Sequence, residues 1–110
     1  MSCVVWPSRP RWGRQQLVDL LLAALVDRAE RVYLIGSFAR DEATGESDVD
    51  LIIVAPTSLP WPERWRPFAD LRAELGAVDL IVYTSEEWER LEAGPTPFLA
   101  HAAESWVRIL

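Results

Sequence analysis

Two short apolar runs joined by a polar segment constrain this chain more than any other feature. Residues 32–54 read VYLIGSFARDEATGESDVDLIIV. The first run, over 31–35, ends at Gly36, and the second, over 48–54, opens with two aspartates. Short apolar runs bounded by glycine or polar residues are typical of buried strands. The stretch therefore predicts a strand, a turn, a short helix, a polar loop and a second strand.

The remaining sequence predicts four helices and two strands around this stretch. Apolar residues three and four apart indicate the first helix, and the pair Thr84 and Glu87 fits a capping box. The expected elements are an irregular arm over 1–13, helices over 14–29, from Pro67 with a stop at Gly76, after Thr84 through Leu91 and over 98–104, and strands over 78–83 and 106–109. This order predicts an α/β (α+β) fold with a small mixed sheet of about four strands, in a single domain over 14–110.

Three local features carry specific expectations. Ser37 is expected to cap a helix over 38–42, because a serine oxygen can accept a hydrogen bond from the first helical turn. Pro67 is placed at a first helical position, where its missing N–H does no harm. The apolar face of the first helix is expected to consist of Val18, Leu21, Leu22, Leu25 and Ala29, widened by Leu17, Leu20 and Val26.

Charge and cysteine content narrow the class of function. The 110 residues carry a net charge of −6, and all eleven basic residues are arginine. Free-standing nucleic-acid binders usually carry the opposite balance, so direct DNA binding is not expected. Cys3 is the only cysteine, which excludes an internal disulfide and favours a reducing compartment. Because no apolar run approaches the roughly 18 residues of a membrane span, we expect a cytoplasmic protein without membrane contact.

The two aspartates that open the second strand point to a cation. Asp48 and Asp50 are two residues apart, so on a strand both side chains project from one face, with Cα atoms roughly 6.5 Å apart. Two carboxylates aimed at one place repel each other unless a divalent cation lies between them. Magnesium prefers one or two carboxylates together with substrate phosphates. Taken alone, such a pair is usually a solvated strand end.

The turn before the polar loop could hold an anion. Gly36 and Ser37 lie at a strand-to-helix turn, where free backbone N–H groups favour a phosphate. Arg40, one helical turn later, could reach the same phosphate, although singly it could equally form a surface ion pair. The combination of turn and aspartates is more specific than either part.

This combination resembles a known signature. Gly36 and Ser37, ten residues, and then Asp48-Val49-Asp50, flanked by apolar strands, resemble the motif of the polymerase-β-like nucleotidyltransferase superfamily. GSFAR and SDVDLIIV are especially similar to its minimal nucleotidyltransferase domains. The resemblance extends from about the first helix to the final strand. In that family a third carboxylate comes from a following strand, and Asp79 in VDLIVY stands at the matching position. Asp41 is a departure, because such domains often carry glycine there; we expect its side chain to face water.

The resemblance implies a nucleotidyltransferase fold and a chemistry. Asp48, Asp50 and Asp79 would be catalytic and would bind two Mg²⁺ ions that clamp the attacking and leaving oxygens. Asp79 would also accept the proton of the incoming hydroxyl. His101, the only histidine, is interpreted as structural. The residues implied to bind the nucleotide, ATP or another NTP, are Gly36, Ser37, Arg40 and Ser47.

Three hypotheses remain for the acceptor of the nucleotide. A stand-alone minimal domain resembles the antitoxin of gene pairs whose toxin is a HEPN-family ribonuclease, and such an antitoxin can transfer AMP to a tyrosine of the toxin, as in a type VII-like pair. The second hypothesis is a small-molecule nucleotidyltransferase whose acceptor pocket forms by dimerisation. The third is a non-catalytic nucleotide-binding module that masks a toxin by contact. The three aspartates favour the two enzymatic hypotheses.

Overall fold

The computed structural model describes residues 10–110 and confirms the predicted order of helices and strands. Most of the expected arm over 1–13 lies outside the described residues, and Pro10 to Gly13 contain no helix or strand. The elements are α1 (Arg14–Leu25), β1 (Arg31–Ile35), α2 (Gly36–Ala39), β2 (Val49–Val54), η1 (Trp61–Glu63), η2 (Arg66–Phe68), α3 (Asp70–Leu75), β3 (Val78–Tyr83), α4 (Ser85–Ala93), α5 (Pro97–Ala103) and β4 (Val107–Arg108). No helix within residues 10–110 is long and apolar enough to cross a membrane.

The four strands form one mixed sheet, as predicted, and their order in the sheet is β3-β2-β1-β4. β1 runs antiparallel to both β2 and β4, whereas β2 and β3 are parallel. β1 and β3 have the predicted bounds, β2 begins one residue later than expected, and β4 is shorter than the 106–109 prediction. The central position of β2 explains its continuous apolar sequence, since strands covered on both faces need no polar alternation.

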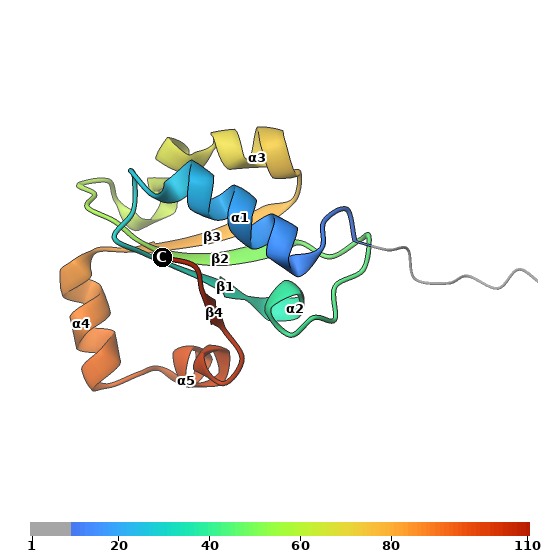
Figure 1. The fold of residues 1–110 in the computed structure, drawn as a ribbon. Coiled ribbons are helices and arrows are strands. Elements are labelled where there is room, and N and C mark those ends of the chain that lie inside the picture. Colours follow the sequence, from blue (N-terminus) through green and yellow to red (C-terminus); the bar gives the residue numbers. More distant parts are fainter. Residues whose placement is uncertain (1–9) are drawn as a thin grey trace, which may run out of the picture.

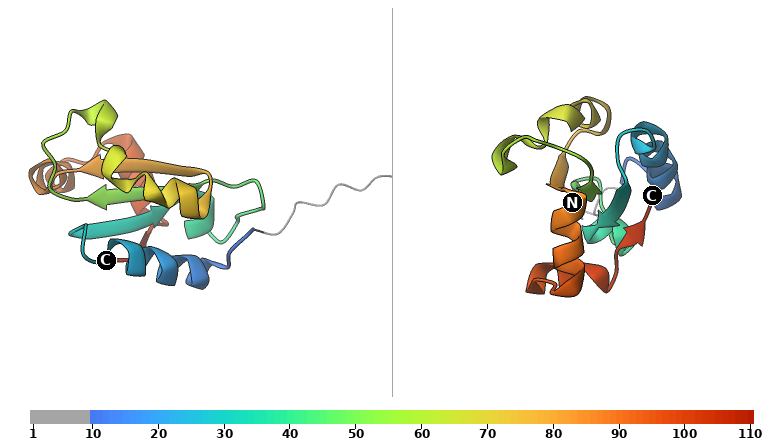
Figure 2. Two further views of the ribbon diagram at one scale, coloured as in Figure 1. Left: turned by 90° about the horizontal axis from the view of Figure 1, so that it is seen from above. Right: turned by 90° about the vertical axis from the view of Figure 1, so that its left-hand side faces the viewer.

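Helices cover both faces of the sheet. α1 and α3 lie over one face, while α4 and α5 lie below the other, and α2 sits at the end of β1 (Figure 1). The side view in Figure 2 shows the same three layers. Side chains that alternate along each strand therefore enter two separate cores. The larger core includes Leu21, Leu34 and Leu51, and the smaller one includes Tyr33, Ile52 and Trp88.

The first helix ends earlier than predicted and buries a narrower face than expected. α1 stops at Leu25 rather than at Ala29. The buried positions are Leu17, Leu21 and Leu25, whereas Leu22 and Val26, which were expected on the buried face, are 37% and 49% exposed. A spacing of four residues follows one line along a helix, and here that line meets the sheet.

The early end of α1 has a visible cause in Arg28. Its Nε donates a hydrogen bond to the carbonyl of Ala24, which satisfies an acceptor that the helix leaves free. Its guanidinium also makes a bidentate ion pair with Asp70, with both N–O distances 2.9 Å, and reaches the carbonyl of Pro67. Arg28 therefore ties the end of α1 to the start of α3.

Pro67 does not begin an α-helix as predicted. It is the middle residue of the 3-10 turn η2, and α3 starts at Asp70. A 3-10 turn tolerates a proline near its start for the same reason that an α-helix does, because that N–H has no partner within the turn. Gly76, with φ of 85°, ends α3 as expected.

The helices of the carboxyl-terminal third follow their capping signals. The Thr84 side chain accepts a hydrogen bond from the backbone N–H of Glu87, and the Glu87 side chain accepts one from the N–H of Thr84. This confirms the capping box, although α4 continues two residues beyond the predicted Leu91. α5 begins at Pro97, one residue earlier than expected, and is capped by Thr96.

The burial pattern along α1 can be tested with two neighbouring leucines, of which one is buried and the other is partly exposed. Leu21→Ala should lower the free energy of unfolding by about 2–5 kcal/mol, because it leaves a cavity in the larger core. Leu22→Ala should lower it by less than about 1 kcal/mol, because that side chain is partly exposed. Chemical denaturation monitored by tryptophan fluorescence measures both. Equal losses for the two variants would contradict the placement of this helix.

Candidate active site

The strand register places the functional side chains in one row across the sheet. Ile35, the last residue of β1, lies opposite Asp50 on β2, and Asp50 lies beside Asp79 on the parallel strand β3. Neighbouring strands are about 4.8 Å apart, and residues in one row point to the same face. Asp50 and Asp79 both line one cavity of about 360 Å³. The structure thus brings together two of the three predicted aspartates.

Gly36 is required on two counts. Its φ is 73°, a conformation that side chains rarely adopt. A Cβ at this position would also overlap Oδ2 of Asp50 and lie 3.3 Å from its Cγ. The Asp50 carboxylate therefore lies directly against the backbone of the turn, and any larger residue at position 36 would displace it.

The short helix after Gly36 differs from the prediction. α2 begins at Gly36, its N-cap is Ile35, and no side chain caps it, so Ser37 is not the cap residue that was expected. Ser37 instead lies within the single turn of the helix. Because the turn begins at Gly36, which has a positive φ, Ser37 lies inside the turn and not at the position that precedes it.

The end of α2 explains the unusual aspartate at position 41. The N–H of Glu42 donates to the carbonyl of Ser37, and the N–H of Asp41 donates to that of Phe38. These two bonds form a Schellman motif, in which the residue after the helix adopts a left-handed conformation and is usually glycine. Asp41 holds this position with φ of 58°. Its side chain is exposed, as predicted.

The other predicted nucleotide contacts separate into two groups. Arg40 lines the cavity with Gly36 and Asp50, and its guanidinium Nε lies 3.1 Å from Glu42 Oε2. Ser47 does not reach this cavity. Its hydroxyl accepts a hydrogen bond of 2.8 Å from the backbone N–H of Thr44 and faces a separate hollow beside Trp12.

Asp48 lies one residue before β2, is exposed, and is not among the residues that line the cavity. Within residues 10–110, no three or more Asp, Glu, His or Cys side chains converge closely enough to hold a metal ion. Asp48 nevertheless acts on its neighbour through space, because its negative charge contributes to the raised pKa of Asp50.

The pKa of Asp50 is raised by its surroundings in the site. Partial burial raises its pKa from 3.8 to about 6, and the negative charges of Asp79 and Asp48 and a hydrogen bond with Asp79 act in the same direction. The positive charge of Arg40 opposes this shift. A carboxylate with a raised pKa next to a second carboxylate is a site that a divalent cation would stabilise.

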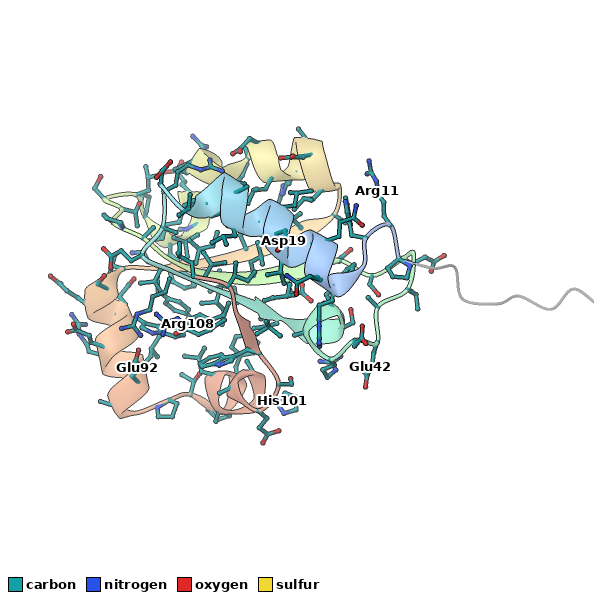
Figure 3. The ribbon with its side chains drawn as sticks, viewed as in Figure 1. Arg11, Asp19, Glu42, Glu92, His101 and Arg108 are labelled. Carbon is teal, nitrogen blue, oxygen red and sulfur yellow. The ribbon has the colours of Figure 1, made fainter. Side chains whose placement is uncertain are left out.

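The opposite wall of the cavity comes from α5 and was missed by sequence reasoning. Phe98, His101, Ala102 and Ser105 line it. Phe98, His101 and Ala102 have the spacing of one helix face, and this signal was available in the sequence, whereas Ser105 lies in the turn that follows the end of α5 at Ala103. His101, interpreted as structural, is not in the core: it is exposed and lies 3.5 Å from Glu104. Figure 3 shows it on the side of α5 that faces α2 and Glu42.

A second cavity of about 380 Å³ lies on the same face of the sheet, on the other side of α5. Its lining includes the clustered aromatic rings of Tyr33, Trp88 and Trp106, with centroids 4.4 to 5.9 Å apart. Glu92 is its only acidic residue and is paired with Arg31. This cavity lacks the carboxylate pair, so the smaller one is the candidate active site.

A comparison with protein-family models matches residues 18–100 to the nucleotidyltransferase domain. The chain belongs to this family. The match includes Gly36, Asp50 and Asp79, and therefore the whole row of functional side chains described above. A search of functionally curated proteins found no match.

Solved structures with the same nucleotidyltransferase fold come from toxin–antitoxin complexes. A toxin–antitoxin with AMP-PNP is 19% identical and covers 90% of this chain and 73% of its own, with a TM-score of 0.57. The complex of a tri-AMPylated HEPN toxin and an MNT antitoxin from Shewanella oneidensis is 19% identical over 88% and 71% of the two chains, with a TM-score of 0.55. A mutant of the MntA–HpeT toxin–antitoxin is 21% identical over 86% and 69%, with a TM-score of 0.51. At such identities the likeness shows a shared fold.

The raised pKa of Asp50 predicts that this nucleotidyltransferase is more stable without the charge. Between about pH 4 and 6 the folded state binds more protons at Asp50 than the unfolded state does, so this group lowers stability as the pH rises. In metal-free buffer at pH 7.5, Asp50→Asn should therefore raise the free energy of unfolding. Because Asp50 is partly exposed, solvent screening limits the gain to about 1 kcal/mol.

Denaturation curves at pH 4 and pH 7.5 test this expectation. Between pH 4 and pH 7.5 the wild-type protein should lose the stability that the protonated Asp50 side chain contributes. Asp50→Asn should show no such loss. Asp27→Asn removes an exposed carboxylate beyond the end of α1 and serves as the control, with no gain expected. A lower stability of Asp50→Asn at pH 7.5 would contradict the electrostatic argument.

The left-handed conformation of Asp41 gives a second prediction. Asp41→Gly should raise the free energy of unfolding by about 0.5–1 kcal/mol, because glycine adopts this conformation without steric cost. Glu46→Gly removes the same charge from the adjoining loop at a residue without positive φ, and should lower stability slightly because it adds freedom to the unfolded chain. Thermal denaturation of both variants measures the difference. Equal effects of the two substitutions would contradict the role given to the left-handed conformation of Asp41.

Proposed function

We propose that this protein transfers AMP from ATP to a hydroxyl group of a partner protein. The observation that carries the proposal is the pair of carboxylates, Asp50 and Asp79, side by side in a cavity whose wall includes Gly36. In a member of the nucleotidyltransferase family, this arrangement offers oxygen ligands and backbone donors within one small space.

The residues present fit a magnesium ion that is held largely by the substrate. Asp50 and Asp79 supply two hard oxygen donors whose negative charges repel each other, and the positive charge of Arg40 only partly opposes this effect. Magnesium is usually bound by one or two carboxylates and by substrate phosphates, so a third protein ligand is not needed. When bound, the ion would supply positive charge to the phosphate oxygens at which negative charge develops. Asp48, just outside the cavity, would complete the set for the two-ion arrangement that the family resemblance implies.

The chain's own residues can then be assigned roles in the transfer. The backbone at Gly36, the Ser37 hydroxyl and Arg40 would hold the β- and γ-phosphates. Asp79 would accept the proton as the acceptor oxygen attacks the α-phosphorus. The new bond joins that oxygen to phosphorus, the bond from phosphorus to the β-phosphate bridging oxygen breaks, and pyrophosphate leaves. α2 is a single turn, so the phosphate contacts depend on individual donors rather than on a helix dipole.

We infer that the acceptor is a tyrosine of a HEPN-family toxin and that the protein acts as its antitoxin. Support comes from the solved complexes, which pair nucleotidyltransferase-fold chains with such toxins, one of them AMPylated. Two alternatives remain open: a small-molecule nucleotidyltransferase acting as a homo-oligomer, and a non-catalytic module that masks a toxin. The carboxylate pair favours the enzymatic alternatives over the last one.

A transfer assay with the protein encoded by the neighbouring gene tests the proposal. The two proteins are incubated with Mg²⁺ and each NTP in turn, and both are weighed by mass spectrometry. The partner should gain the mass of one or more AMP groups, with tyrosine as the modified residue. Asp79→Asn should abolish the adduct while leaving ATP binding largely intact, because it removes the proton acceptor and not the phosphate contacts.

Two results would count against this function. Transfer by Asp79→Asn at a rate near wild type would remove Asp79 from its proposed role. If no adduct forms and the double variant Asp48→Ala, Asp50→Ala still protects cells from the partner, the protein acts by masking and the enzymatic proposal fails. A nucleotide adduct on a small molecule alone would favour the second alternative.

A further inference from the structure

The carboxylate cavity has an apolar wall that the transfer chemistry does not use. Five large hydrophobic side chains are exposed within residues 10–110, namely Leu22, Val26, Trp61, Trp65 and Phe98. Phe98 alone among them lines this cavity, where it lies with Ile81 of β3 and Ala102 of α5. An aromatic ring that remains 48% exposed inside a cavity is available to contact a ligand.

Phe98 is not needed to hold α5 on the sheet. The next residue, Leu99, is 4% exposed and packs in the smaller core with Tyr33 and Trp88. Thr96 caps the start of the helix by accepting a hydrogen bond from the N–H of Leu99. The position of α5 therefore depends on Leu99, Ala102 and the cap, while the ring of Phe98 faces outward.

The bond between the α-phosphorus and the nucleoside indicates which part of the reactants lies near Phe98. In the proposed transfer, the α-phosphorus lies at Asp50 and Asp79, and the nucleoside is joined to that phosphorus through a single ester oxygen. The ribose and base are therefore within reach of the residues that line this cavity, whose volume of about 360 Å³ is in the range of small-molecule pockets. An acceptor hydroxyl on a partner protein carries its own surface and approaches from solvent.

We propose that Phe98 is the stacking surface for the nucleobase of the bound nucleoside triphosphate, with His101 of the same helix and Ser105 of the following turn lining the cavity beside the nucleoside. This inference rests on the proposed function. Every nucleobase has a planar face, so stacking is tolerant of base identity. The site should therefore accept purine nucleoside triphosphates with little discrimination between adenine and guanine at this wall.

Binding measurements without turnover test the role of Phe98. The probes are the α,β-methylene analogues of ATP and GTP, which cannot release pyrophosphate, and inorganic tripolyphosphate, which has no base, each with Mg²⁺ in a calorimeter. Phe98→Ala should weaken both nucleotide analogues by about tenfold and leave tripolyphosphate unchanged. Phe98→Trp should retain the affinity of the wild type. Leu22→Ala, an exposed leucine on the opposite side of the sheet, is the control and should change nothing.

The outcomes separate this inference from the function on which it rests. An equal loss of affinity for tripolyphosphate, or no loss for either nucleotide analogue, would overturn the stacking role while transfer by the wild type still stands. Unchanged nucleotide affinity with a raised KM for the acceptor protein would assign Phe98 to the acceptor instead. If the wild-type protein binds no nucleotide analogue, the inference and the proposed function both fail.

Discussion

The close packing of the Asp50 carboxylate against Gly36 is the constraint on which the rest of the site depends. It requires a residue without a side chain at the end of β1 and a strand pairing that sets Ile35 opposite Asp50. The parallel pairing with β3 then adds Asp79 in the same row. The fold therefore holds like charges together at a cost in stability. A protein selected for stability alone would place a neutral residue at one of these positions.

The two faces of the sheet have different roles. The face toward α1 and α3 is covered by the larger apolar core, which consists mainly of aliphatic side chains. The face toward α4 and α5 contains aromatic rings at one end and the carboxylate row at the other. Because side chains alternate along β2, Leu51 and Ile53 secure the first face while Asp50 and Ile52 belong to the second. One strand thus contributes to both the main core and the active site.

The sequence predicts the central strands well, and with them the positions of Asp50 and Asp79 on β2 and β3, because these depend on local pattern. Continuous apolar runs defined β1 and β3 to the residue, and the position of Asp79 on β3 followed from the family signature. Features that depend on tertiary packing were harder. The buried face of α1 is selected by the sheet from a helix with leucines on several sides, and Ser37 lost its capping role because Gly36 already turns the chain. The cavity residues on α5 could not be predicted from local pattern alone, because their role depends on this helix folding back against the face of the sheet that contains Asp50.

The two ends of the cavity come from different parts of the chain. Gly36, Arg40 and Asp50 belong to one antiparallel hairpin, so their arrangement depends on contacts between residues close in sequence. Asp79 and Phe98 come from later segments that reach the cavity only through a long connection and a parallel pairing. The end of the cavity formed by Gly36, Arg40 and Asp50 can therefore stay fixed while the later segments vary. Divergence within such a family would change what a member recognises more readily than the bond it makes.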